Sequence, residues 1–564
     1  MIESAMEHGV TLFFRQPLAR NRVRFRFFAA SGDLAGCEMV WWKRSAPAWR
    51  VVTRLSLRRD DGIRAEWTCE ILFPEEAHYI KYFFRATDRS GASLCLCERG
   101  CSPREPEDGF WELLQVSESD LPAVPAWAQG CTYYQIFPER FAMGDASLHP
   151  APLPPWDALP TRENFLGGDL RGIRDHLPYL RDLNVDCLYL NPVFAADFNH
   201  KYATADYYRV DPAFGRNEDL RELTKVAHSM GIRVVLDGVF NHVGVHFPPF
   251  ADLMEKGEDS RYRAWFYPKR FPIEIDPACY ECVGDYPYMP RLRVACPEVR
   301  DYVCGVLRYW MDYAGVDGWR LDVADELDAA AVRAFRQAVK ADRPDALLLA
   351  ETWGDASRLV CEGDQFDCAM NYLFRDAVID YFARRRIDET AFGHRLERLL
   401  MKYPDAVNLA MYNCLGSHDT ARFLTECGGD KRFLRLATAF QMTFAGSPAL
   451  YYGDEIGMAG DNDPLCRGGM RWDDMDRPLL CDVRRLTALR RAHPSLRRGD
   501  YRLVLADPVR HVFAFERRGG GERALVAFNL GQEPRQVDFA DAGRKVDVLP
   551  LSVEIVIDEK EVFP

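Results

Sequence analysis

The sequence predicts a multidomain chain in which a central (β/α)8 TIM barrel lies between two β-sandwich domains. The chain has 564 residues, which is too many for a single hydrophobic core. Residues 1–122 and 496–564 contain short β-type runs separated by polar turns. Between residues 128 and 495, strand-like runs alternate with helix-like runs about eight times, which is typical of a closed β/α barrel.

The N-terminal domain, residues 1–122, is predicted from the runs between Thr11 and Val116, among them VRFRFFAA and HYIKYFFRAT. About eight such runs with no convincing helix between them favour a β-sandwich. The segment LPAVPAWAQG follows, and its prolines and small residues indicate a linker.

The barrel, residues 128–495, is predicted from apolar runs such as RVVL and LLLA. Continuous apolar runs are typical of parallel strands that are covered by helices. Residues 243–295 form a long aromatic and proline-rich insertion after the third strand, and an insertion of this length is usually functional. The predicted helices are Leu170–Leu183, Asn217–Met230, Pro297–Ala314 and Ala329–Ala341. Residues 496–564 return to β-type runs and form the C-terminal domain.

Composition excludes some classes of partner. The net charge is −13 and basic residues are spread among acidic ones, so neither a nucleic acid nor an anionic membrane is expected as a partner. The chain has no apolar run of membrane-spanning length and no leader pattern at its start, which predicts a cytoplasmic protein. Its 17 cysteines are scattered, as expected of reduced thiols.

Acidic residues recur where the predicted barrel strands end, the usual position of barrel active sites. These residues are Asp237, Asp322, Glu351 and Asp419. Arg320 shares a strand face with Asp322, so we expect it to keep that carboxylate ionised. A buried Arg–Asp pair that only holds a sheet together is the structural alternative. Several carboxylates at one barrel mouth favour a catalytic site instead, because glycoside hydrolysis needs a carboxylate and a carboxylic acid side by side.

Four segments resemble the signature regions of the α-amylase family of glycoside hydrolases, in the same order and on the expected strands. They are DGVFNH (Asp237–His242), GWRLDVADE (Gly318–Glu326), ETW (Glu351–Trp353) and GSHD (Gly416–Asp419). Three more stretches resemble the neopullulanase, cyclomaltodextrinase and maltogenic amylase subgroup. They are Asn199–Gly215, Met289–Leu292 and Tyr451–Arg467.

The resemblance implies a role for each matching residue. Asp322 would be the nucleophile, Glu351 the general acid and base, and Asp419 the third carboxylate, which holds the sugar ring as it distorts. Arg320 would orient Asp322. The other substrate-binding residues implied are Tyr202, His242, His418, Asp463 and Arg467, and Asp237 and Asn241 would support the site.

The resemblance also bears on cofactors and assembly. Relatives often bind calcium near the start of the barrel, but the segment FAMGDASLHP offers few oxygen ligands. We therefore expect no required cofactor, and Asp145, Gly168 and Asp169 are the residues that remain as candidate calcium ligands. The subgroup's N-terminal domain, which is similar to carbohydrate-binding modules, often mediates dimerisation, so the resemblance implies a homodimer.

The sequence as a whole predicts a retaining hydrolase of α-1,4-glucosidic bonds in cyclodextrins, maltooligosaccharides or pullulan, with transglycosylation left open. One alternative is a disaccharide-directed glucosyl transferase or isomerase on the same barrel. A second is a non-catalytic glucan-binding scaffold, which the intact set of carboxylates disfavours. The order of preference among these substrates depends on the loops around the site, above all on residues 243–295.

Overall fold

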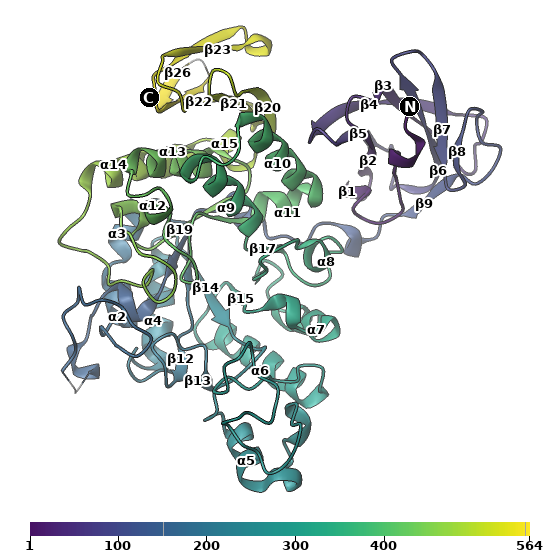
Figure 1. Cartoon of the computed structure of the whole chain (residues 1–564). Coiled ribbons are helices and arrows are strands. Elements are labelled where there is room, and N and C mark those ends of the chain that lie inside the picture. Colours follow the sequence, from purple (N-terminus) through teal and green to yellow (C-terminus); the bar gives the residue numbers. More distant parts are fainter. Residues whose placement is uncertain (150–151, 559, 564) are drawn as a thin grey trace. The chain divides into compact units, whose positions relative to one another are not determined.

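A computed structural model describes residues 1–149, 152–558 and 560–563, and in it the chain divides into two compact units (Figure 1). The first unit comprises Met1–Ala123, Val360–Gly363 and Thr390–Asn408. The second comprises Val124–Leu359, Asp364–Glu389 and Leu409–Pro564.

The first unit is built on a sheet of nine antiparallel strands, in the order β1-β2-β5-β4-β3-β6-β7-β8, with β9 paired to β6. Alternating residues of β2, including Val23, Phe25 and Phe27, are buried, as the period of two of a strand requires. The strands are β1 Arg15–Ala19, β2 Arg22–Ala30, β3 Leu34–Lys43, β4 Val51–Asp60, β5 Arg64–Leu72, β6 His78–Asp88, β7 Ser93–Cys97, β8 Gly100–Ser102 and β9 Trp111–Gln115.

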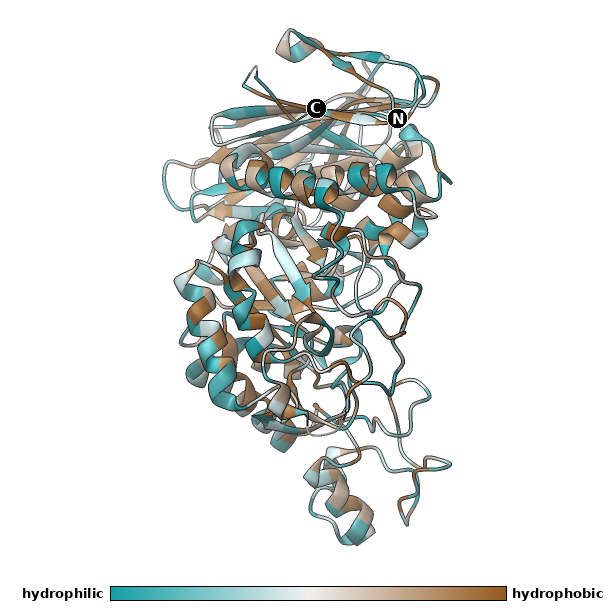
Figure 2. Ribbon diagram, turned by 90° about the vertical axis from the view of Figure 1, so that its left-hand side faces the viewer, coloured by the Kyte–Doolittle hydropathy of each residue, from teal (hydrophilic) through white to brown (hydrophobic). Residues whose placement is uncertain are grey.

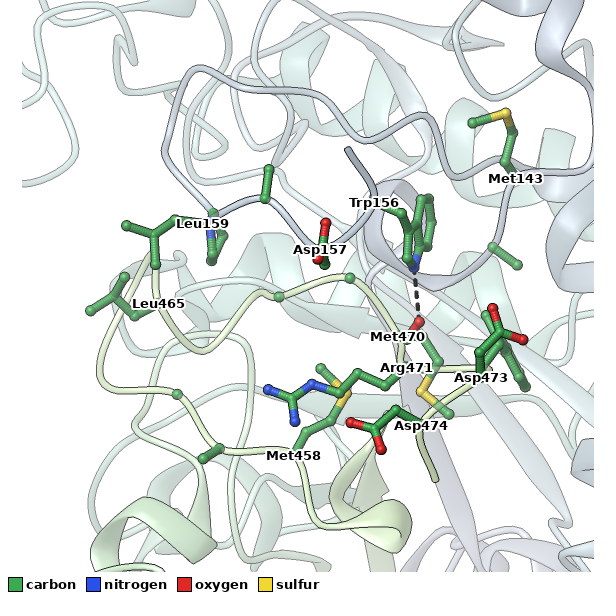
Figure 3. A pocket seen from close by; sticks show the side chains of 18 of the residues that line it. Met143, Trp156, Asp157, Leu159, Met458, Leu465, Met470, Arg471, Asp473 and Asp474 are labelled. Carbon is green, nitrogen blue, oxygen red and sulfur yellow. Dashed lines mark hydrogen bonds between the residues drawn. The ribbon is translucent and has the colours of Figure 1, made fainter. Parts of the chain in front are cut away.

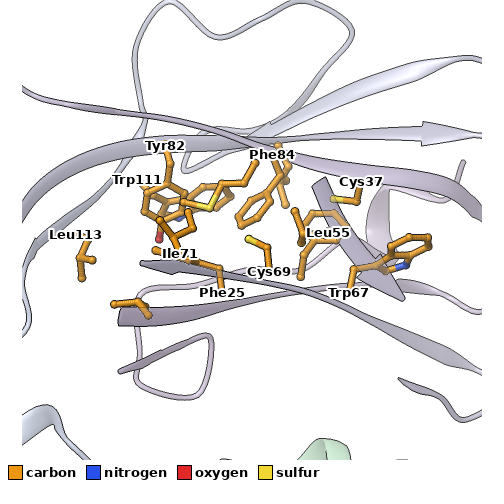
Figure 4. Close-up of a cluster of buried hydrophobic side chains, with 14 of the residues drawn as sticks. Phe25, Cys37, Leu55, Trp67, Cys69, Ile71, Tyr82, Phe84, Trp111 and Leu113 are labelled. Atoms are coloured by element: carbon orange, nitrogen blue, oxygen red, sulfur yellow. The ribbon is translucent and has the colours of Figure 1, made fainter. Parts of the chain in front are cut away.

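The core of this sheet is rich in aromatic rings (Figure 4). Phe25, Tyr82, Phe84 and Trp111 point toward one another between the strands, and the rings of Tyr82 and Trp111 stack at 5.9 Å. Aromatic side chains bury large apolar areas, so these rings contribute much of the stability of the sandwich.

The second unit contains an eight-stranded parallel barrel. The strand order is β17-β16-β15-β14-β11-β10-β19-β18, and a parallel bridge from Met370 to Tyr412 joins the two ends of this order. The strands are β10 Tyr133–Ile136, β11 Cys187–Leu190, β14 Arg233–Gly238, β15 Gly318–Leu321, β16 Leu347–Ala350, β17 Cys368–Ala369, β18 Tyr412–Cys414 and β19 Ser447–Tyr451.

Helices cover the barrel. In α4, buried residues recur every three to four positions, at Leu220, Leu223 and Ala227, and Figure 2 shows hydrophilic and hydrophobic residues on the same helices, as expected of amphipathic helices on a sheet. The helices are α2 Leu170–Asp175, α3 Leu177–Asp182, α4 Asn217–Ser229, α6 Pro297–Tyr313, α7 Ala329–Lys340, α9 Tyr372–Val378, α13 Lys431–Thr443, α14 Arg477–Ala492 and α15 Pro494–Arg498.

One predicted helix is divided. The span Leu170–Leu183 forms two short helices, α2 and α3, with His176 between them. Pro178 lies in the first turn of α3, which is where a helix tolerates proline because no intrahelical N–H bond is lost there. Of the helices in the described residues, none combines the length and the apolar character needed to cross a bilayer.

The insertion at residues 243–295 folds back onto the mouth of the barrel. It contains α5 (Pro248–Lys256) and then returns to the end of β14. There, the Val243 N–H donates to the Pro290 carbonyl at 3.0 Å, and the Leu292 N–H donates to the Asn241 carbonyl at 2.9 Å. These bonds fasten the last part of the insertion beside the strand ends.

The chain ends in a small β-domain within the second unit. Its main sheet has the order β20-β21-β22-β25-β26, and β23 and β24 form a separate pair. Val512, Ala514, Leu525 and Val548 are among the buried residues of its core. The strands are β20 Asp500–Asp507, β21 Val512–Gly519, β22 Glu522–Asn529, β23 Arg535–Phe539, β24 Arg544–Val548, β25 Ser552–Ile557 and β26 Lys560–Phe563.

Candidate active site

Three adjacent strands of the barrel place charged residues together. Asp237 lies in β14 and pairs in register with Arg320 of β15. Asp322 directly follows β15, and Glu351 directly follows β16. Because these strands are parallel and neighbours, their carboxyl ends meet at one end of the barrel.

The Arg320 guanidinium holds these carboxylates together. Its Nη1 lies 2.6 Å from Asp237 Oδ1 and 2.8 Å from Asp322 Oδ1, and its Nη2 lies 2.9 Å from Glu351 Oε2. Arg320 is completely buried, so it can keep its charge only if acidic partners surround it. One buried cation therefore faces three carboxyl groups.

Burial and the excess of acidic groups raise the pKa of two of these carboxyl groups. Burial raises the pKa of Asp322 well above its ordinary value. The charge of Arg320 opposes this shift, whereas Glu351, Asp237 and Asp419 add to it. Burial also raises the pKa of Asp237 against the attraction of Arg320. The expectation that Arg320 simply keeps Asp322 ionised is therefore incomplete, because burial and the neighbouring carboxylates outweigh the attraction of Arg320.

A cavity of about 390 Å³ opens beside this cluster. Of the residues predicted from the sequence, Tyr202, His242, Asp322, Glu351, Asp419, Asp463 and Arg467 line it. Its other lining residues are Arg162, His200, Val283, Tyr286, Tyr288, Met289, Val323, Asp325 and Trp353. Arg320, Asp237, Asn241 and His418 lie behind this lining.

His242 has free hydrogen-bonding capacity at the cavity. Both ring nitrogens are buried and have no hydrogen-bond partner among the described residues, and Nε2 lies 4.0 Å from Asp322 Oδ2. Burial lowers the pKa of His242 to about 3, so the ring is neutral and offers one donor and one acceptor. A buried polar group normally has a partner, and a ligand hydroxyl in the cavity would supply one.

His418 acts within the wall of the site. Its Nδ1 faces the Gln135 amide nitrogen at 2.9 Å, and its Nε2 lies 2.5 Å from the Tyr202 hydroxyl. Because the amide donates to Nδ1, the neutral ring carries its hydrogen on Nε2. Tyr202 in turn donates to Asp237 Oδ2 at 2.9 Å. His418 therefore orients Tyr202, which itself lines the cavity.

Asp419 is held from the opposite side of the cavity. Its Oδ1 lies 3.1 Å from Arg467 Nη2, and Arg467 Nη1 lies 2.9 Å from Asp463 Oδ1. The Arg467 Nε–H also donates to the His418 carbonyl at 2.7 Å. These contacts orient Asp419 toward the cavity, where it is the most exposed of the three predicted catalytic carboxylates, at 30%.

The two predicted supporting residues, Asp237 and Asn241, contact different parts of the site. Asp237 accepts from the Tyr189 hydroxyl at 2.7 Å as well as from Tyr202 and Arg320, so it orders the cluster directly. Asn241 donates to Glu326 Oε2 at 3.3 Å, and its carbonyl accepts from the insertion. Asn241 therefore positions the insertion beside the site.

Sequence reasoning missed part of the cavity wall. Trp353 stacks on Tyr372 at 4.1 Å and is 53% exposed, which leaves aromatic surface open to a ligand. Tyr286 and Tyr288 come from the insertion, where the aromatic run DYPYMP was the available signal. Val323 has φ 48°, and its N–H donates to Glu351 Oε2 at 2.8 Å. No sequence pattern indicated that contact.

Two of the three candidate calcium ligands, Asp145 and Asp169, are already engaged by other groups. Asp169 is an N-cap whose oxygens accept the N–H groups of Gly172, Gly144 and Asp145. Asp145 accepts from Ser147 and forms an ion pair with Arg171 at 2.8 Å. A cation already neutralises Asp145 and backbone donors occupy Asp169, so this donor set does not fit a calcium ion.

The chain is similar to known enzymes along most of its length. The family described as "Alpha amylase, catalytic domain" matches residues 135–479. The chain is 40% identical to a cyclomaltodextrinase of Geobacillus thermopakistaniensis and 41% identical to neopullulanase 2 of Thermoactinomyces vulgaris, in each case over 95% of this chain and 92% of the relative. A solved cyclomaltodextrinase structure matches with a TM-score of 0.91 at 36% identity, over 95% of this chain and 93% of that one.

Because the buried His242 ring is neutral, we expect the folded protein to lose stability as the pH falls. Its pKa is about 3 when folded against 6.5 ordinarily, so below pH 6.5 the unfolded chain binds a proton that the folded site does not. Stability is fully present above pH 6.5 and falls with pH down to about 3. We expect His242→Gln to reduce this slope by about 1.4 kcal/mol per pH unit, measured as the unfolding free energy of the second unit between pH 6 and 4.

His246→Gln is the matched control, because the His246 side chain is 69% exposed. Identical slopes for wild type and His242→Gln would contradict the buried neutral imidazole.

Proposed function

Since the chain belongs to the α-amylase family of glycoside hydrolases, we propose that it cleaves α-1,4-glucosidic bonds in cyclodextrins, maltooligosaccharides or pullulan with retention of anomeric configuration. The observation that carries this proposal is the sharing of the Arg320 guanidinium by Asp322 and Glu351 at the edge of one cavity. Retaining hydrolysis uses two such carboxyl groups, about 5–5.5 Å apart.

In the first step, Asp322 attacks the anomeric carbon as a carboxylate, and the bond to the glycosidic oxygen breaks. Glu351 gives its proton to that oxygen, so the leaving sugar departs with a hydroxyl group. The product is a glycosyl ester of Asp322. The Val323 N–H and Arg320 both contact Glu351 Oε2, and they stabilise the negative charge that Glu351 gains.

In the second step, Glu351 takes a proton from water, and the resulting hydroxide attacks the same carbon. Asp322 leaves as a carboxylate, and the two inversions together give retention. A sugar hydroxyl in place of water would give transglycosylation. Arg320 faces both Asp322 and Glu351. Its positive charge therefore compensates the negative charge on whichever of the two carboxyl groups is ionised at each point of the cycle.

The remaining wall is proposed to bind the sugar. His242 has two unpartnered nitrogens for hydroxyl groups, and Tyr202 offers its ring. Asp419, Asp463 and Arg467 supply charged hydrogen-bonding groups, which discriminate well between hydroxyl positions. The disaccharide transferase alternative is not favoured, because the relatives that span this chain are a cyclomaltodextrinase and a neopullulanase.

We further propose that the enzyme needs no metal. Asp145 and Asp169 are already engaged by Arg171 and by backbone N–H groups. The catalytic steps above use only water and groups of this chain.

A homodimer formed through the first unit is also proposed. This unit exposes apolar side chains, among them Trp49 at 81%, Val52 at 52%, Leu57 at 51% and Leu72 at 70%. Exposed apolar groups of this kind mark interaction surfaces when they gather in a patch.

The proposed location is the cytoplasm. Among the described residues the cysteines form no disulfide, and reduced thiols are typical of proteins in a reducing compartment. Fractionation of cells would test this location.

The function is tested by product analysis with β-cyclodextrin, pullulan, maltotriose and soluble starch as separate substrates. We expect reducing sugars from at least one of the first three. Asp322→Asn and Glu351→Gln should each lower activity by orders of magnitude while the protein stays folded, because each removes one of the two reacting carboxyl groups. Unaltered circular dichroism and melting temperature would check the fold.

Asp328→Asn is the matched control. Asp328 caps helix α7 through Ala331, and asparagine caps helices equally well, so this variant should retain full activity. Near-wild-type turnover by Asp322→Asn would sink the assignment of the nucleophile.

Removal of metal ions tests the second proposal. After dialysis against EDTA, we expect the turnover number and the melting temperature to stay unchanged, and added calcium to restore nothing. A drop in either quantity that calcium reverses would show that a metal site exists.

Sedimentation velocity tests the assembly. We expect the wild-type protein to sediment with twice the mass of one chain and Leu57→Lys to shift it toward the single chain, because a lysine placed in an apolar interface must bury its charge. Leu114→Lys on β9 of the same unit is the control, since Leu114 is also exposed, at 59%. Wild-type protein that sediments as a single chain would refute the dimer.

A further inference from the structure

The order of the strands around the barrel indicates the direction in which the substrate extends along the cavity. Asp322 and Glu351 follow β15 and β16, whereas Arg162 lies in the connection after β10 and Asp463 in the connection after β19. In the strand order, β10 and β19 are neighbours on the far side of the barrel from β15 and β16. On the proposed function, Glu351 protonates the leaving sugar, so the part of the glucan that becomes bound to Asp322 extends toward β10 and β19.

An ion pair lies in the lining of the cavity at that far side. Arg162 Nη2 lies 3.1 Å from Asp463 Oδ2. Asp463 is anchored, because its other oxygen contacts the buried Arg467. The backbone beside Arg162 is anchored too, since the Asn164 carbonyl accepts from the side chains of Arg140 and Asn199. The Arg162 side chain itself is 49% exposed, so it can turn away without any change in the fold.

A second and larger cavity, of about 1260 Å³, is lined by residues close in the chain to both members of this ion pair (Figure 3). The two segments that carry Arg162 and Asp463 also line it, through Trp156–Pro160 on one side and Gly460, Asp461 and Leu465 on the other. Figure 3 shows Leu159, Leu465 and Trp156 around the cavity. We call this cavity the outer pocket.

The chemistry of the outer pocket suits a sugar. Trp156 and Trp472 supply aromatic surface, and Asp157, Arg471 and Asp473 supply charged hydrogen-bonding groups. A glucosyl ring has apolar C–H faces and a rim of hydroxyl groups, which match an aromatic surface with polar groups beside it.

We propose that the Arg162–Asp463 ion pair is a gate that limits how many glucosyl units bind on the Asp322 side of the cleaved bond. The outer pocket receives the units that pass the gate. With the ion pair closed, the substrate ends at Asp463, and short products result. Because a partly exposed ion pair contributes little stability, a long linear glucan can displace Arg162.

The test is the distribution of first-cleavage products from maltohexaose labelled at its reducing end, because the unlabelled fragment is the part that was bound to Asp322. We expect Arg162→Ala to increase the ratio of unlabelled products longer than maltose to unlabelled maltose about two- to fivefold, the factor that loss of a partly exposed ion pair can produce. The specificity constant for maltohexaose should rise by a similar factor relative to that for maltotriose. Arg162→Lys, which keeps the charge, should stay close to wild type.

Arg171→Ala is the matched control, because Arg171 is also partly exposed, at 43%, and pairs with a single aspartate. An unchanged product ratio in Arg162→Ala, or an equal change in Arg171→Ala, would overturn the gate. Either result would leave the proposed hydrolysis itself intact, whereas a wild-type protein without any glucan product would refute the proposed function first.

The outer pocket is tested in the Arg162→Ala background. Trp156→Ala should reverse the gain in long products, while Trp156→Phe, which keeps a ring but loses the N–H bond to the Met470 carbonyl, should retain most of it. No effect of Trp156→Ala would show that the outer pocket holds no sugar, and would overturn that part of the proposal.

Discussion

The neutralisation of one buried cation organises the active site. A guanidinium with no solvent contact requires anionic partners, and Arg320 finds them on its own strand and on both neighbouring strands. Through Asp237, the same network reaches Tyr189 and Tyr202, and through Tyr202 it reaches His418. The charge balance of the barrel interior and the geometry of catalysis therefore depend on the same contacts.

Much of the barrel and of the reacting centre could be predicted, because both follow from short-range rules. A period of two places Arg320 and Asp322 on one face of a strand, and their 2.8 Å contact agrees with that rule. Helix α7 begins after Asp328, whose side chain caps it, as the preference of aspartate for that position implies. The raised pKa of Asp322 could not be predicted from such rules, because it results from burial, and burial depends on the whole fold.

The walls of the site could not be predicted, because they come from segments with no periodic pattern. Arg162 and Asp463 are 301 residues apart in the chain, and no local signal pairs them. Tyr286 and Tyr288 reach the cavity because the insertion is fastened to the end of β14, by bonds that only the folded chain shows. Residues Thr390–Asn408 belong to the first unit despite their position in the middle of the barrel sequence.

Val323 has an unfavourable backbone conformation that the geometry of the site requires. A β-branched residue with φ 48° and ψ 49° stands in the left-handed region, at a cost of roughly 1–2 kcal/mol. This turn aims the Val323 N–H at Glu351. The chain therefore carries a strained residue where a glycine or an asparagine would relax the backbone. A variant that relaxes the backbone at this position would gain thermal stability but lose turnover. Heat tolerance and catalytic activity therefore oppose each other at a single peptide unit.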